Sequence, residues 1–244
     1  MSRLLLSLAL VAATALPAAA ETVNVAVAAN FTAVAEDLAA LFEAKGEHKV
    51  ELSFGATGQL YTQITQAAPF GIFLAADTDR PQMAIEEGLA VHGSFFVYAE
   101  GRLVLYAPGR DVIDGEAALA GEFNKLAIAD PAAAPYGKAA VETLTALGLI
   151  DALTPKLVQG ENISQTLQFI ESGNAELGLV AASQVLGKPD QWLVPAQLHE
   201  PIAQGAVLLK EGETNPAALA FLDFLQSEEA VAVIEAAGYS VPTP

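Results

Sequence analysis

The stretch between residues 50 and 77 constrains the fold most, because strand-like and helix-like segments alternate within it without a long loop. Residues 50–54 have strand character, and the glycine-flanked turn Gly55-Ala56-Thr57-Gly58 follows them directly. From Gln59 the apolar spacing is helical, and residues 70–75 form a second apolar strand. A strand, a helix and a strand in close succession indicate parallel strands with helices packed against the sheet.

The same alternation begins earlier and continues along the rest of the chain. Residues 22–28 (TVNVAVA) read as a buried strand, and the apolar residues that follow repeat at helical spacing until Gly46. A second series starts near residue 103 and repeats this order without obvious sequence identity. Further strands are expected at 95–99, 103–107, 126–129, 157–158, 177–182 and 201–209, and further helices at 138–147, 165–171, 216–225 and 228–236.

Two series of this kind predict an α/β protein with two lobes, each a mainly parallel sheet flanked by helices. Lobe 1 is expected to comprise residues 21–104 and 204–244, and lobe 2 residues 105–203. The chain would then cross between the lobes twice, near 103–108 and 201–205. Two crossing segments form a hinge.

The first twenty residues have the three-part pattern of a secretory signal peptide. Arg3 precedes an apolar run at 4–16, and Pro17 and three alanines lead to Glu21. The apolar run is too short to span a bilayer. The chain contains no cysteine, which excludes a lipoprotein anchor, a disulfide framework and a thiolate metal site. Residues 1–20 are therefore expected to be a signal peptide, and the mature protein is expected to be periplasmic.

The charge of the chain restricts its partners. Eleven basic residues stand against twenty-nine acidic ones, for a net charge of −18, and no cluster of lysines or arginines interrupts the acidic surface. Nucleic acid and anionic membranes are therefore excluded as expected partners. An anionic ligand would have to be held by short-range hydrogen bonds, because the overall field repels it.

Motifs of the common enzyme classes are absent from the sequence. There is no G-x-S-x-G, no H-E-x-x-H, and no glycine-rich nucleotide loop, and His48, His92 and His199 are isolated in polar surroundings. Asp77 and Asp79 lack the glycine of a calcium loop and are interpreted as structural, with Asp79 as a helix cap. We therefore expect no enzyme activity, no catalytic residues and no direct cation ligands.

Neutral hydrogen-bond donors occur where strands or loops give way to helices. Asn30, Thr57 with Gly58, the region of Tyr136, and Ile163 all have this position, and ligands of parallel sheets bind beyond the carboxyl ends of the strands. A fully ionised oxyanion needs only donors, whereas a protonated one also needs an acceptor carboxylate. Asn30 has an alternative role as a helix N-cap, and the glycine-flanked turn at Thr57 has one as a simple connection.

With these features, the sequence resembles the periplasmic molybdate-binding (ModA-type) proteins of ABC transporters, which have the type II periplasmic binding protein fold. The resemblance extends from Val23 to Pro242. It rests on several short blocks in the same order: 28–31 (AANF), 53–58 (SFGATG), 71–77 (GIFLAAD), 130–137 (DPAAAPYG), 161–163 (ENI) and 236–239 (AAGY).

The resemblance implies capture of molybdate, and of tungstate, between two lobes, followed by delivery to an inner-membrane ABC permease. It implies no cofactor, and we expect a monomer. A receptor for another oxyanion such as sulfate, or for a small organic anion, is the alternative. An organic anion would normally require an arginine for its carboxylate, and we expect none at the edge of the cleft.

The resemblance also implies the residues of the site. Thr57 would supply a hydroxyl, and Tyr136 and Ile163 would supply main-chain amides. Two positions depart from the family pattern: Ala181 stands where some members have a tyrosine, and Ala29 where others have a threonine. The residues expected to bind the anion are Asn30, Thr57, Tyr136 and Ile163, with Ala29 and Gly58 as secondary main-chain candidates.

Overall fold

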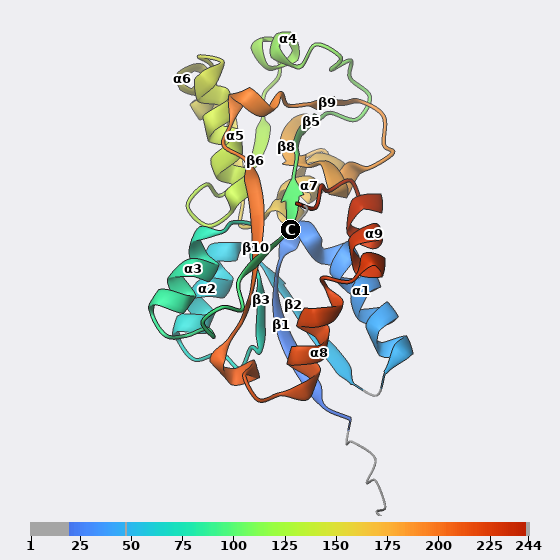
Figure 1. Ribbon diagram of the computed structural model, residues 1–244. Helices are drawn as coiled ribbons and strands as arrows, with labels where there is room; N and C mark the ends of the chain where they lie inside the picture. Colours follow the sequence, from blue (N-terminus) through green and yellow to red (C-terminus); the bar gives the residue numbers. More distant parts are fainter. Residues whose placement is uncertain (1–19, 47, 243–244) are drawn as a thin grey trace, which may run out of the picture.

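The computed structural model describes residues 20–46 and 48–242, and Figure 1 shows two lobes stacked one above the other. Each lobe contains one five-stranded sheet. The expected signal peptide at 1–20 lies outside the described residues except for its last position. No helix in the described part of the chain is long and apolar enough to cross a membrane.

The sheet of the first lobe has the strand order β2-β1-β3-β10-β4. Its strands are β1 (Thr22–Ala28), β2 (Lys49–Gly55), β3 (Ile72–Leu74), β4 (Phe96–Gly101) and β10 (Ile202–Leu208). β1 pairs in parallel with β2 and β3, whereas β10 is antiparallel to both β3 and β4. Four strands therefore run in one direction and β10 runs against them.

Both faces of this sheet are covered by helices (Figure 1). Along β1, Val23, Val25 and Val27 belong to one buried cluster and Ala26 to another, as expected for a strand buried on both faces. The first cluster includes residues of α1 (Thr32–Lys45), α8 (Pro216–Phe224) and α9 (Glu228–Ala236), and the second includes residues of α2 (Thr57–Thr65) and α3 (Asp79–Glu86).

The second lobe repeats this topology with the order β7-β6-β8-β5-β9. β6 is parallel to β7 and β8, and β5 is antiparallel to β8 and β9. The strands are β5 (Leu103–Tyr106), β6 (Leu126–Ala129), β7 (Leu157–Gly160), β8 (Leu177–Ala181) and β9 (Gln191–Leu193), and the helices are α4 (Gly115–Ala120), α5 (Pro135–Ala146), α6 (Ile150–Leu153) and α7 (Ile163–Glu171). Short 3-10 turns complete the chain at η1 (Ala29–Phe31), η2 (Thr154–Lys156), η3 (Ala182–Val185), η4 (Ala196–Leu198) and η5 (Lys210–Gly212).

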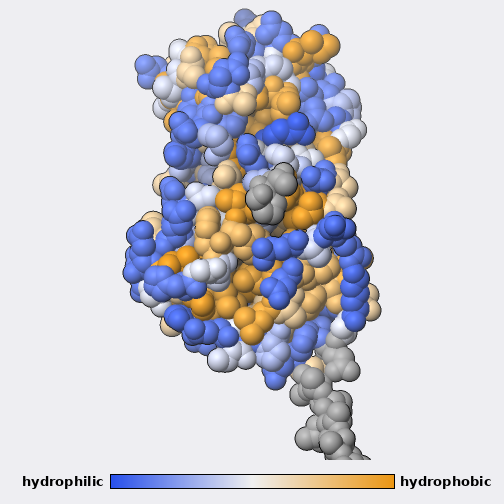
Figure 2. Space-filling view, viewed as in Figure 1, coloured by the Kyte–Doolittle hydropathy of each residue, from blue (hydrophilic) through white to orange (hydrophobic). Residues whose placement is uncertain are grey.

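The chain passes between the sheets at Arg102 and again after η4. Leu103 already pairs with β8, and Ile202 already pairs with β4. The sheets therefore divide the chain about two residues earlier than the predicted lobe boundaries at 104 and 204. The C-terminal segment also reaches this waist, since Ser240 forms an isolated bridge with Glu100. In the space-filling view hydrophilic residues cover much of both lobes, and apolar residues gather near the waist (Figure 2).

The predicted fold class, two helix-flanked sheets in two lobes, is confirmed. Besides the short 3-10 turns, the elements that the sequence did not predict are α4, α6 and β9, which are three to six residues long. Such short segments carry less than two turns or two alternations, so their pattern cannot be told from that of a loop.

Candidate functional site

A small cavity between the lobes is lined by residues from four helix starts, those of η1, α2, α5 and α7. Measured as the space open to the centre of a water-sized sphere, its volume is about 10 Å³. Asn30, Thr57, Tyr136 and Ile163 all line it and are at most 5% exposed. Its other lining residues are Ala28, Ala29, Gly55, Ala56, Ala76, Ala134, Pro135 and Asn162.

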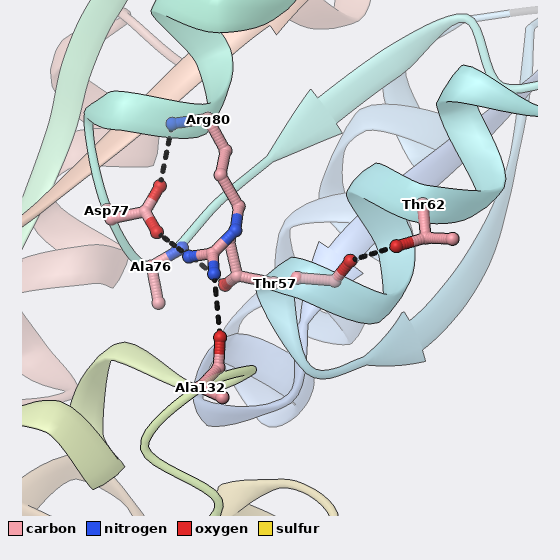
Figure 3. Close-up of polar contacts among 7 residues, drawn as sticks. Thr57, Thr62, Ala76, Asp77, Arg80 and Ala132 are labelled. Carbon is pink, nitrogen blue, oxygen red and sulfur yellow. Dashed lines mark hydrogen bonds and ion pairs between the residues drawn. The ribbon is translucent and has the colours of Figure 1, made fainter.

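Thr57 is the first residue of α2, and its side chain faces the end of β3 (Figure 3). The main-chain N–H of Ala76 donates to Thr57 Oγ1 at 3.0 Å. Because this bond uses the oxygen as an acceptor, the hydroxyl proton of Thr57 remains available as a donor. Thr57 is 1% exposed, so a ligand in the cavity would receive this bond away from water.

Main-chain amides from both lobes also lack an acceptor. Among the described residues, no hydrogen bond is formed by the N–H of Thr57, Tyr136 or Ile163. Each lies in the first turn of its helix, where no intrahelical acceptor exists. The Asn162 side chain caps α7 by accepting from Ser164 and Gln165, which leaves the Ile163 amide free. These amides and the positive ends of the helix dipoles favour an anion.

The N–H groups of the Asn30 side chain are bonded to other residues and are not free for a ligand. Asn30 Nδ2 donates to Gln204 Oε1 at 2.9 Å and to the Tyr239 hydroxyl at 3.0 Å, which uses both of its N–H groups. It does not act as the helix N-cap either, since the cap positions of η1 and α1 are Ala28 and Phe31. Asn30 lines the cavity, and the alternative that it caps a helix is wrong.

The two secondary main-chain candidates have different surroundings. The Gly58 amide donates to the Ala133 carbonyl at 2.8 Å, so it is already used in a contact between the lobes, and Gly58 does not line the cavity. The expectation that it binds the ligand does not fit this geometry. Ala29 lines the cavity, and its carbonyl accepts from the Ser164 hydroxyl of the second lobe at 3.1 Å.

A charged link lies beside the cavity (Figure 3), so the expectation of no arginine at the edge of the cleft is wrong. Arg80 forms an ion pair with Asp77 and donates from Nη2 to the Ala132 carbonyl of the second lobe at 3.0 Å. Asp77 Oδ1 also accepts from the Arg80 amide, whereas Asp79 is the first residue of α3. Asp77, and not Asp79, thus supplies the capping bond of this helix.

A larger groove of about 620 Å³ opens next to this link. It is lined by both lobes and contains Arg80, Asp77 and the ion pair between Lys138 and Glu142, whose charged atoms are 3.6 Å apart. Lys138, the one basic residue adjacent in sequence to the expected donors, therefore faces the groove and is absent from the cavity lining. Among the residues that the structure describes, no charged side chain lines the small cavity.

Three buried polar side chains next to the cavity were not predicted as neighbours of the site. Gln204, Tyr98 and Tyr239 lie behind it and are 0%, 2% and 6% exposed. Burial raises the pKa of Tyr98 and Tyr136 well above the usual phenol range, so both hydroxyls stay neutral donors at physiological pH. The signal for Gln204 was present in the sequence as a lone polar residue in the apolar strand PIAQGAVLL.

The sequence of this chain matches that of a known protein family. The model of the bacterial extracellular solute-binding proteins matches residues 23–240, which is nearly the whole described chain. The chain belongs to this family. This family and the relatives described next are binding proteins and not enzymes, so the prediction that the chain is not an enzyme is confirmed.

Relatives of this solute-binding protein share much of its length. It is 53% identical to the molybdate-binding protein ModA of Rhodobacter capsulatus, over 96% of this chain and 94% of the relative. It is 48% identical to ModA of Azotobacter vinelandii, with 92% of both chains covered. The solved periplasmic molybdate-binding protein of Azotobacter vinelandii superimposes with a TM-score of 0.87 at 36% identity, covering 91% of this chain and all of that one.

The Arg80 link generates a prediction about Asp77. Burial raises the pKa of Asp77, and the Arg80 guanidinium opposes that rise. Arg80→Met should therefore raise the Asp77 pKa further, as measured by a carboxyl ¹³C NMR titration. A carboxyl whose pKa is higher in the folded than in the unfolded state contributes stability at low pH, and this contribution is lost as pH rises through the folded-state pKa. In the variant the loss of stability should therefore be larger and extend to higher pH.

Arg102→Met is the matched control, since Arg102 contacts the Gly238 carbonyl and not Asp77. An Asp77 titration that is identical in the Arg80→Met variant and the unsubstituted protein would show that the guanidinium does not act on this carboxyl.

Proposed function

We propose that this protein is the substrate-binding component of a molybdate ABC importer. The observation that carries the proposal is the small interlobe cavity, which is lined by neutral residues at four helix starts and is bordered by unpaired amides from both lobes. The identity of 53% and 48% with two proteins named as molybdate-binding supports molybdate as the ligand. Delivery to an inner-membrane permease, tungstate as a second ligand and a monomeric state are parts of the same proposal.

The donor set of the proposed site combines one hydroxyl with main-chain amides. Thr57 donates from Oγ1 and from its own amide, and Tyr136 and Ile163 donate amides from the opposite lobe. Asn30 contributes its main-chain N–H, because its side-chain N–H groups are bonded to Gln204 and Tyr239. An anion held between the two sets would bridge the lobes and hold them closed.

The absence of a carboxylate from the cavity lining favours an oxyanion without a proton. A protonated phosphate would place its own O–H among hydrogen-bond donors, and a buried hydroxyl without an acceptor costs free energy. Molybdate, tungstate and sulfate are all unprotonated dianions at neutral pH, so selection among them would depend on the size of the cavity. The acidic surface does not oppose capture at close range, since the donors act over hydrogen-bond distances while the field of the exposed charges is screened by salt.

The remaining parts of the proposal concern location and motion. Residues 1–20 act as a signal peptide that directs the mature chain to the periplasm. Residues 21–104 with 204–244 form one rigid lobe and 105–203 the other, to within the two-residue difference seen in the sheets. Closure turns these lobes about the segments near Arg102 and residues 199–201.

Titration calorimetry on the mature chain tests the ligand directly. Molybdate and tungstate should release heat with one site per chain, sulfate should bind more weakly, and phosphate should give no heat at neutral pH. The absence of heat with both metal oxyanions would refute the proposed function. Tighter binding of sulfate than of molybdate would assign the protein to the alternative, a sulfate receptor.

Two substitutions separate the side-chain donor from the main-chain donors. Thr57→Ala removes a hydroxyl that would bond a dianion, and the loss should be about 1.5–3 kcal/mol, or roughly 10- to 150-fold in Kd. Thr57→Ser is the control, because it keeps the hydroxyl. Ile163→Ala keeps its amide and should weaken binding much less than Thr57→Ala. A larger loss for Ile163→Ala than for Thr57→Ala would contradict the proposed donor roles.

A further inference from the structure

A buried polar network lies directly behind the cavity, on the side of the hinge, and is centred on Gln204. Gln204 is 0% exposed and belongs to β10, the strand that follows the second crossing. Its Oε1 accepts from Asn30 Nδ2 at 2.9 Å and from the Tyr98 hydroxyl at 3.0 Å. A buried side-chain amide requires such partners, because an unsatisfied one would be destabilising.

The network joins the two lobes. Gln204 Nε2 donates to the Tyr136 hydroxyl of α5, in the second lobe, at 3.3 Å. The Tyr239 hydroxyl, on the C-terminal segment, donates to the Asn30 carbonyl at 2.9 Å. Its oxygen also lies 2.9 Å from the hydroxyl of Ser183, which belongs to η3 of the second lobe. Both bonds run between the lobes, so a rotation of one lobe against the other acts on them.

Two members of the network belong to the cavity as well. Tyr136 lines the cavity, and its amide there has no acceptor among the described residues, while its side chain extends to Gln204. Asn30 likewise lines the cavity while its side chain bonds Gln204 and Tyr239. Gln204 thus contacts one cavity residue from each lobe without touching the cavity itself.

The backbone at the first crossing is shaped around this contact. A Cβ atom added to Gly101, the last residue of β4, would lie 2.0 Å from the Tyr136 hydroxyl and 2.7 Å from Gln204 Nε2. No side chain fits there. The Tyr136 and Gln204 side chains therefore meet against the main chain of Gly101, next to the first crossing. Gln204 itself lies just after the second crossing.

We propose that Gln204 is a positioning residue that couples lobe closure to anion binding, by bonding Asn30 of one lobe and Tyr136 of the other. The inference rests on the proposed function for its ligand. The Tyr136 bond at 3.3 Å is near the upper limit of hydrogen-bond length, so a rotation that moves α5 by about half an ångström breaks it. The network is complete only in the closed form and stabilises that form before a ligand arrives.

Such a device changes affinity without donating to the ligand. The apparent dissociation constant equals the intrinsic one divided by the fraction of molecules in the binding-competent form. Loss of the network lowers the closed fraction, so binding weakens although every donor to the anion remains. The dissociation rate rises, because the complex opens more readily.

The test compares Tyr136→Phe, Gln204→Leu and the double variant. Tyr136→Phe keeps the amide that faces the cavity and removes only the hydroxyl. We expect about tenfold weaker molybdate binding for Tyr136→Phe, with most of the change in the dissociation rate. The double variant should bind no more weakly than Gln204→Leu alone, because both remove the same link. Tyr106→Phe is the control: Tyr106 is a buried tyrosine of the second lobe outside the network.

A second measurement follows closure without any ligand. The chain has no cysteine, so fluorophores can be placed at Leu219→Cys in the first lobe and Ile113→Cys in the second, both at exposed positions. Energy transfer in the ligand-free protein should show a larger open fraction for Tyr136→Phe and Gln204→Leu than for Tyr106→Phe. Thermal unfolding of each variant is measured alongside, so that a change in stability can be told apart from a change in the open fraction.

The outcomes separate the inference from the proposed function. An unchanged open fraction in Tyr136→Phe overturns the inference, as does unchanged molybdate affinity in a protein that binds molybdate. If the unsubstituted protein binds no molybdate, the proposed function fails, and the ligand-free energy transfer still decides the role of the network. If Gln204→Leu does not fold, Tyr136→Phe carries the test by itself.

Discussion

Unpaired main-chain N–H groups at buried helix starts are the constraint on which this structure depends. Buried amides without an acceptor cost free energy, and here the starts of α2, α5 and α7 bring such groups from two lobes to one cavity. An ionised oxygen satisfies them better than water does, because charge-assisted bonds are stronger. In the proposed mechanism the lobes separate about the hinge, so that the same groups are hydrated in the open form and paired with an anion in the closed one.

Charged side chains are kept apart from the proposed anion site. Arg80 and Lys138, the basic residues near the cleft, are paired with Asp77 and Glu142 and face the larger groove, whereas the cavity lining is neutral. Neutral donors discriminate by proton content and size, since a fixed positive charge would attract every anion. The lobes are also joined by contacts that involve no ligand, such as the bond from the Gly58 amide to the Ala133 carbonyl.

The parts that the sequence predicted are those set by local pattern. β1, β6 and α9 begin and end at the predicted residues, because their apolar periodicity and flanking residues are unambiguous. Thr57, Tyr136 and Ile163 were found at one cavity because each follows a strand or loop and begins a helix. The direction of the Asn30 side chain could not be predicted, since its partners Gln204 and Tyr239 are 174 and 209 residues away in the chain. Likewise, nothing local to Gly58 indicates that its amide is taken by Ala133.

A crystal structure of the protein with molybdate would show whether an oxyanion is held in the small neutral cavity by donors of both lobes. We expect molybdate oxygens within hydrogen-bond distance of Thr57 Oγ1 and of the amides of Tyr136 and Ile163, with no carboxylate or basic side chain in contact. Molybdate bound instead in the larger groove, against Arg80 or Lys138, would refute a neutral site between the lobes.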